Sequence, residues 1–125
     1  MKQVLALALA GAVGSLARWA LAGWTYRLLG DRLAYGTLVV NVLGCLVIGI
    51  VMETVVLSNV IPHDWRVPIT VGFLGAFTTY STFAYETMRY VETGNWPAAL
   101  LNVVLTLVLC LGATWLGFFV ARASF

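Results

Sequence analysis

Residues 72–83 read GFLGAFTTYSTF, a segment in which hydroxyl side chains interrupt an apolar run. Gly72 and Gly75 come first, and five consecutive hydroxyl residues follow at 78–82. Glycine and β-branched threonine are weak helix formers, and hydroxyl groups offer the backbone alternative hydrogen-bond partners. We therefore predict a helix that is broken near its middle. The alternative is a continuous helix whose small residues pack closely against a neighbour.

The chain around this segment is too apolar for a soluble protein. Of its 125 residues, 62% are hydrophobic and 10% are charged, whereas a soluble domain has about 45–50% apolar and about 25% charged residues. A bilayer accommodates such a composition. The net charge of +2 is too small to indicate a nucleic-acid partner.

Four apolar segments predict four membrane crossings, roughly at residues 4–29, 35–57, 67–89 and 96–120. Each is longer than the ~20 residues that a helix needs to cross a bilayer, and the short connections are rich in turn-forming residues. We expect a multi-pass all-α protein of the cell (inner) membrane, with residues 1–125 in a single four-helix domain. The broken helix is the third.

The N-terminal segment also has some features of a secretory signal. Lys2 precedes an apolar run, and residues 8–10 read ALA, like a cleavage site. The apolar run continues past Trp19 to Leu29. That length favours a membrane span over a signal peptide.

The basic residues outside the spans show no preference for one side of the membrane. Four crossings place three of them on each side, so the positive-inside rule gives no bias. We therefore predict dual topology, in which copies insert in both orientations and pair antiparallel; the alternative is that another residue, such as Arg18, fixes the orientation. The residues counted are Lys2, Arg66 and Arg122 on one side and Arg27, Arg32 and Arg89 on the other.

Polar residues inside the first two spans are candidates for function. Arg18 lies a little past the middle of the first span, where a cation is costly and marks a functional site by default; the alternative is that its head group snorkels to the interface. In the second span, Thr37, Asn41 and Cys45 share one helical face. Asn41 offers N–H donors without charge, which suits an anion, although it also suits interhelical packing.

The fourth span carries a polar stripe, and two glutamates lie toward the ends of their spans. Glu86 shares a face with Thr82 and Arg89, so it is either a vestibule residue or the ion-pair partner of Arg89. Glu53 is the nearest candidate for the deep carboxylate that a proton-coupled cation exporter requires. Hydrogen-bond donors deep in the membrane, without a carboxylate beside them, favour an anion over a cation as the transported ion. The stripe comprises Asn102, Thr106, Cys110 and Thr114, and it either lines a path or bonds to neighbouring helices.

These segments resemble the signatures of the small microbial fluoride channels, the Fluc family. The resemblance rests on GSLARW at 14–19, GTLVVNVLG at 36–44, residues 72–83 and Glu86, and it covers all four spans in order. It implies a fluoride-selective channel, not an enzyme, that lets fluoride leave passively and relieves its toxicity. It also implies an antiparallel dual-topology dimer with two pores, although some members pair two different chains. The alternative function is a small antiparallel multidrug or cation exporter.

The resemblance also implies roles for particular residues. Asn41 would line each pore, and the ring edges of Tyr80 and Phe83 would contact the ion. Backbone carbonyls of Gly75 and Thr78 from both subunits would hold a central Na⁺ at the dimer interface. The chain departs from the family pattern in three places. Many members have phenylalanine at the position of Tyr80, and the pattern also differs at Ala76 and along the fourth helix. The other implied pore residues are Ser81, Thr82, Thr37, Glu86, Thr106 and Cys110, with Arg18 in the vestibule.

Overall fold

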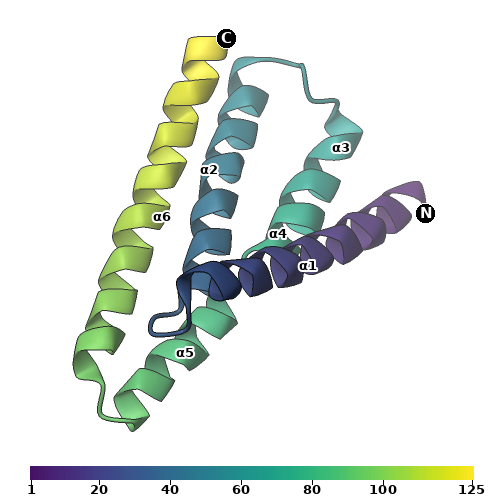
Figure 1. Cartoon of the computed structure of the whole chain (residues 1–125). Coiled ribbons are helices and arrows are strands. Elements are labelled where there is room, and N and C mark those ends of the chain that lie inside the picture. The colour runs from purple at the N-terminus through teal and green to yellow at the C-terminus, as the bar shows by residue number, and fades with distance from the viewer.

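The computed structural model describes all residues, 1–125, and the chain forms helices without strands (Figure 1). Three helices are long and apolar enough to cross a membrane: α1 (Lys2–Leu29), α2 (Tyr35–Leu57) and α6 (Trp96–Ser124). Their bounds agree with three of the predicted segments to within a few residues. The predicted all-α membrane fold is confirmed.

The third crossing is divided into four short helices. These are α3 (His63–Val67), the π-helical turn η1 (Pro68–Leu74), α4 (Gly75–Phe77) and α5 (Tyr80–Glu92). Thr78 and Thr79 between α4 and α5 have extended backbones, with ψ angles of 159° and 115°. The predicted break is therefore confirmed.

Two details of the third crossing were not predicted. The break spans two residues, Thr78 and Thr79, because residues 80–82 form the first turn of α5. The wider turns of η1 were not predicted. Pro68 begins η1 and has no N–H to donate, and the Thr70 hydroxyl bonds the Arg66 carbonyl oxygen at 2.7 Å.

The helices pack so that the break lies between α1 and α2. Helix α2 packs mainly against α6, and α1 crosses η1 and α4 (Figure 1). Two glycines permit these close approaches: a Cβ at Gly14 would lie 2.3 Å from the Phe73 carbonyl oxygen, and a Cβ at Gly117 would lie 2.5 Å from that of Leu46. Small residues at helix crossings are typical of membrane packing.

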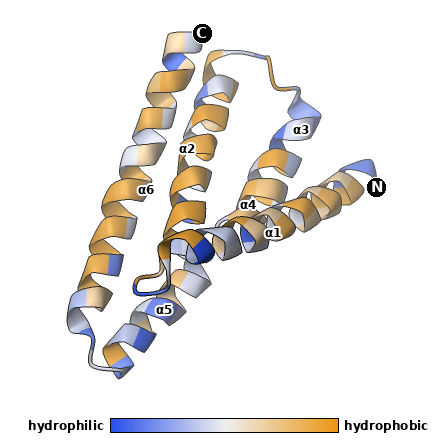
Figure 2. Cartoon of the chain, in the orientation of Figure 1, coloured by the Kyte–Doolittle hydropathy of each residue, from blue (hydrophilic) through white to orange (hydrophobic).

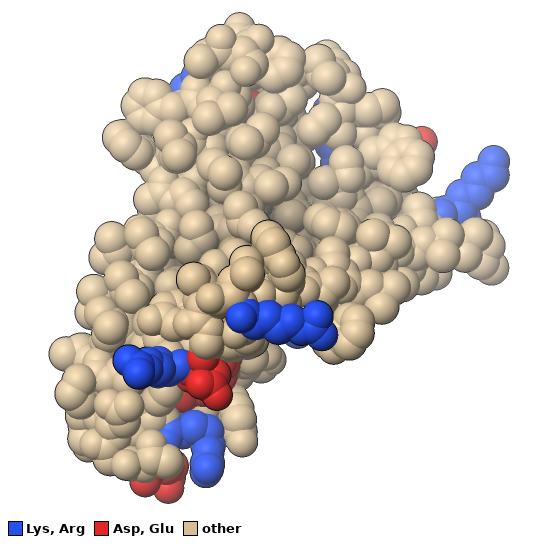
Figure 3. Space-filling model, in the orientation of Figure 1, with Lys and Arg blue, Asp and Glu red and all other residues tan.

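The outer faces of the long helices are apolar. Only 19 of 125 residues are buried, and large side chains such as Leu107 and Leu111 are exposed. Figure 2 shows apolar residues along α1, α2 and α6, whereas α5 is more polar. Large parts of the face in Figure 3 carry no charged side chain. This surface requires lipid or another protein chain around it.

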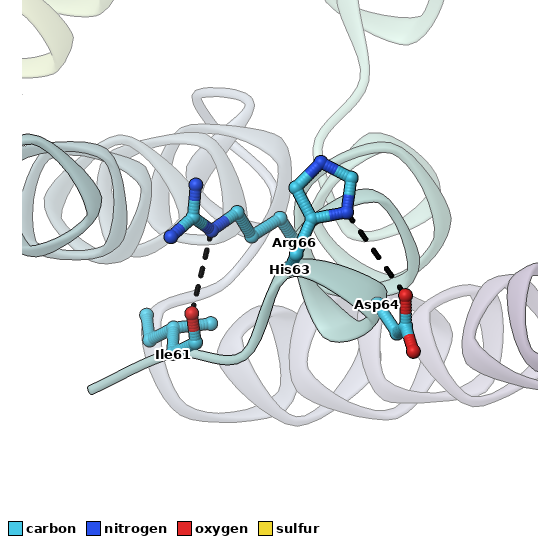
Figure 4. A network of polar contacts seen from close by, with 4 residues as sticks. All are labelled: Ile61, His63, Asp64 and Arg66. Atoms are coloured by element: carbon cyan, nitrogen blue, oxygen red, sulfur yellow. Dashed lines mark hydrogen bonds and ion pairs between the residues drawn. The ribbon is translucent and has the colours of Figure 1, made fainter. Parts of the chain in front are cut away.

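The two ends of the molecule carry polar contacts. The C-terminus and the α2–α3 loop lie at one end, and the α5–α6 loop lies at the other (Figure 1). In α3, Arg66 Nε donates to the carbonyl oxygen of Ile61 in the preceding loop at 3.3 Å, and His63 Nδ1 lies 4.0 Å from Asp64 Oδ1 on exposed side chains (Figure 4). Such exposed pairs contribute little stability. The contacts shape the loop without forming a site.

Candidate functional site

The side-chain amide of Asn41 holds the break in place. Asn41 Nδ2 donates to the Thr79 carbonyl oxygen at 3.0 Å, and the Thr79 N–H donates to Asn41 Oδ1 at 2.8 Å. Asn41 is buried on α2. Because an unpaired backbone group is costly in a membrane, one amide stabilises the unwound residue by satisfying both of its polar groups. A second N–H on Nδ2 remains available to a ligand.

Arg18 supports the break from the other side. Its Nε donates to the carbonyl oxygen of Ala76 at 2.9 Å, at the C-terminal end of α4. That carbonyl has no helical partner, because the helix ends one residue later. One guanidinium nitrogen is therefore bonded within the protein. The remaining N–H groups of the guanidinium are free to attract an anion.

Two other carbonyls at the break lose the partners they would have in a continuous helix. The Gly75 carbonyl would accept from the Thr79 N–H, which instead donates to Asn41. The Thr78 carbonyl would accept from the Thr82 N–H, which instead donates to Thr79 Oγ1 at 3.2 Å. Carbonyl oxygens are suitable ligands for a hard cation. The two carbonyls assigned to Na⁺ by resemblance are thus the type of group that such an ion needs.

Asn41 lines a pocket of about 390 Å³ between α2, α6 and the third crossing, here called the Asn41 pocket. The rings of Tyr80 and Phe83 lie side by side at its edge, with centroids 5.8 Å apart and planes tilted by 58°. Tyr80 is 81% exposed. The pocket brings together seven of the residues predicted for pore and ion: Asn41, Gly75, Thr78, Tyr80, Phe83, Thr106 and Cys110.

A second pocket of about 480 Å³, the Arg18 pocket, lies toward α1 and contains the other predicted residues except one. Glu86 is its acidic member, and it accepts hydrogen bonds from the Tyr26 hydroxyl at 2.9 Å and from the Thr37 hydroxyl. It forms no ion pair with Arg89, so that alternative is wrong. The predicted residues that line this pocket are Arg18, Thr37, Thr82 and Glu86.

Thr79 connects the two pockets, because it lines both of them. The hydrogen-bonded pair of Asn41 and Thr79 therefore stands between one pocket and the other. Ser81 lines neither pocket, and its hydroxyl lies 3.5 Å from Thr79 Oγ1. The predicted site thus forms two groups on either side of the break, with Ser81 beside them.

Comparison with known proteins identifies the family of the chain. The profile of the family described as CrcB-like protein, Camphor Resistance (CrcB), matches residues 5–118. The chain belongs to this CrcB-like family.

Relatives within the family match nearly the whole chain. A protein of Geobacter metallireducens named fluoride-specific ion channel FluC is 48% identical over 98% of this chain and 98% of its own length. Proteins with the same name from Citrifermentans bemidjiense and Pelobacter propionicus are each 47% identical over 98% of this chain, covering 99% and 95% of the relatives. This CrcB-like chain is therefore a multi-pass membrane protein.

The polar stripe on α6 of the CrcB-like chain serves two purposes. Its outer members bond neighbouring helices: Asn102 Nδ2 donates to Thr87 Oγ1 at 2.9 Å, and Thr114 Oγ1 lies 3.1 Å from the carbonyl oxygen of Cys45. Its inner members, Thr106 and Cys110, line the Asn41 pocket. The bonding alternative is therefore correct for Asn102 and Thr114. That Thr106 and Cys110 line a path stays a prediction.

Two residues of the site were not singled out from the sequence. Tyr26 bonds Glu86 in the Arg18 pocket, and Thr79 pairs with Asn41. Tyr26 follows Arg18 by eight residues, and such spacing places two side chains on one helical face. That spacing was the available signal for Tyr26. Thr79 had no comparable signal, because its role depends on its backbone.

Proposed function

We propose that this CrcB-like chain forms a fluoride-selective channel that lets fluoride leave the cell passively across the inner membrane and so relieves its toxicity. The observation that carries the proposal is the convergence of hydrogen-bond donors at the break: Asn41 from α2, Arg18 from α1 and the first turn of α5. The relatives' name, fluoride-specific ion channel, supports the same conclusion and describes a channel and not an enzyme.

The start of α5 suits a small anion. Its first N–H groups have no partner within the helix, and the helix dipole adds partial positive charge there. Because α5 begins at Tyr80, beside the Asn41 pocket, this positive end lies next to the proposed path. Fluoride holds water tightly, so a pore must replace that water with donors. The ring edges of Tyr80 and Phe83 add positive character.

The proposed path runs through both pockets past Asn41 and Thr79. Arg18 attracts the anion into the vestibule, where hydroxyl groups offer O–H donors. Thr106 and Cys110 line the path beyond the break. Glu86 accepts two hydrogen bonds, which tie its carboxylate to α1 and α2. The hydroxyl groups of the vestibule are those of Thr37 and Thr82, and Ser81 lies beside Thr79 at the break.

The proposal includes an antiparallel homodimer with two pores. The equal number of basic residues on the two sides removes the electrostatic reason for a single orientation, and the exposed apolar faces leave room for a partner. We further propose that the Gly75 and Thr78 carbonyls of both subunits hold a Na⁺ ion at the interface. Such an ion would offset the partial negative charge of these carbonyls and hold the two breaks together.

A cation exporter has less support. It would need a free carboxylate deep in the membrane, but Glu53 lies near the end of α2 and pairs with Arg122 on α6 at 2.7 Å. Glu86 is engaged by two hydroxyl groups. No acidic side chain is therefore free at the break to exchange a proton for a cationic substrate.

Growth of a fluoride-sensitive bacterium tests the proposal in cells. A strain that lacks its own fluoride exporters should grow in millimolar fluoride when it expresses this chain. The same strain should accumulate a cationic dye as before, because no dye is exported. Failure to restore growth, with the protein present in the membrane, would contradict the proposed function. Lower dye accumulation that depends on Glu53 would favour the exporter.

A further inference from the structure

The two cysteines of the chain meet across a helix pair. Cys45 on α2 and Cys110 on α6 are both free thiols, and both line the Asn41 pocket. The Thr114 hydroxyl lies 3.1 Å from the carbonyl oxygen of Cys45 and 3.1 Å from that of Cys110. One hydroxyl group therefore bridges the backbones of the two cysteines. Cys45 and Cys110 therefore lie at the same level along α2 and α6.

The backbones of α2 and α6 approach closely at this level. A Cβ at Gly49, one turn after Cys45, would lie 2.4 Å from the carbonyl oxygen of Thr114, one turn after Cys110. Short side chains on two helices in such contact face one another across a small gap. Cys45 and Cys110 therefore face the same pocket from adjacent helices.

We propose that Cys45 and Cys110 form a two-thiol binding site for a soft, thiophilic metal ion that prefers two ligands, with Hg²⁺ as the probe. Thiolates select soft metals. The chain has no group of three or more His, Cys, Asp or Glu residues placed to hold a metal, so the four-ligand arrangement typical of structural zinc is absent.

Binding of Hg²⁺ balances without an oxidant or reductant. Two S–H bonds break, two S–Hg bonds form, and two protons leave to water. The charge of the ion is cancelled by the two thiolates, so the bound group is neutral. A neutral group is tolerated in an apolar pocket, whereas an isolated charge is not. The bridge links α2 to α6 and occupies part of the Asn41 pocket.

Metal retention tests the site without reference to transport. Reduced protein in detergent is given one equivalent of Hg²⁺ and desalted in buffer that contains a competing monothiol. Wild-type protein should retain one Hg²⁺ per chain, because two thiols on adjacent helices act as a chelate with a high effective concentration. Cys45→Ser and Cys110→Ser should each lose the metal to the competitor. Retention by both single variants, or loss from the wild type, would overturn the proposal.

Fluoride flux tests the consequence of metal binding, which rests on the proposed function. Hg²⁺ should block at least ten-fold the fluoride efflux of wild-type protein in liposomes, relative to its own untreated flux. With Hg²⁺ present, Cys45→Ser should keep most of the flux that it shows without Hg²⁺. Addition of a monothiol should reverse the block in the wild type. Equal block of wild type and Cys45→Ser would overturn this part. Absence of flux before Hg²⁺ is added would contradict the proposed function, while metal retention would still decide the site.

Discussion

Asn41 illustrates how one residue serves structure and transport together. Its amide donates one N–H to the Thr79 carbonyl oxygen and accepts a hydrogen bond from the Thr79 N–H, so it fixes the unwound backbone. The second N–H of the amide remains available to the pocket. A carboxylate of the same size keeps the acceptor and loses both donors. In addition, it would face the Thr79 carbonyl oxygen and repel an anion.

We therefore predict that Asn41→Asp reduces fluoride flux to the level of protein-free liposomes. The lost hydrogen bond should also destabilise the fold by about 1–3 kcal/mol. The readouts are electrode-measured efflux and thermal unfolding in detergent. Asn59→Asp is the matched control, because it makes the same change in an exposed loop. Normal flux in Asn41→Asp would show that Asn41 does not line the pore.

The sequence indicates the polar residues of the site better than it indicates their hydrogen-bond partners. Arg18 and Asn41 stand out as polar groups in apolar spans, and the structure brings both to the break. Their partners are the backbone carbonyls of Ala76 and Thr79. Every residue has a carbonyl, so the sequence offers no sign of which ones a side chain will reach. The roles of these residues in transport stay predictions.

Among the elements, the start of α5 depends on a single cap. Thr79 Oγ1 accepts from the Thr82 N–H at 3.2 Å, in place of the Thr78 carbonyl oxygen. Thr79→Ala should destabilise the protein by about 1 kcal/mol, the typical value of an N-cap. Thr79→Ser should cost much less, because serine keeps the hydroxyl group. Thermal unfolding of the two variants checks this, and equal loss in both would show that the cap is unimportant.

The crossing of α2 and α6 depends on glycine. A Cβ at Gly117 would lie 2.5 Å from the Leu46 carbonyl oxygen, whereas a Cβ at Gly112 on the same helix meets nothing within 4 Å. Gly117→Ala should therefore lower stability by about 1–3 kcal/mol, the usual cost of overpacking. Gly112→Ala should be neutral or stabilising, because alanine is the better helix former. If both variants unfold at the wild-type temperature, the helices do not meet as described.

Element bounds and the break were predictable, but the shape of the third crossing was not. Hydropathy gives the spans, because apolar runs need a bilayer, and the glycine and hydroxyl residues indicate where a helix weakens. The π-helical turn at Pro68–Leu74 begins at a proline, which has no N–H to donate to a preceding carbonyl oxygen. The break ends at Tyr80 because Thr79 caps α5 there. Both features depend on hydrogen bonds between successive helical turns, which the amino-acid composition does not reveal.

For the whole molecule, the equal count of basic residues makes a prediction about assembly. Adding basic residues on one side should force a single orientation. Asn59→Lys with His63→Lys biases one loop, and Asp31→Lys with Glu92→Lys biases the opposite side; these positions are exposed. Each double variant alone should lose fluoride flux, because an antiparallel pair needs both orientations.

Expressing the two double variants together should restore the flux. Each supplies the orientation that the other lacks. The measurement is fluoride efflux from membrane vesicles, with protein amounts matched by immunoblot. Full flux from either double variant alone would contradict the antiparallel dimer.

Fluoride efflux from liposomes that contain the purified wild-type chain is the decisive test of a fluoride-selective channel. A fluoride electrode follows fluoride, and a parallel sample follows chloride. We predict rapid fluoride release with chloride retained, because the donors around Asn41 and Thr79 replace the water of a small anion. Well-folded protein that releases no fluoride, or that releases chloride equally fast, would show that the chain is not a fluoride-selective channel.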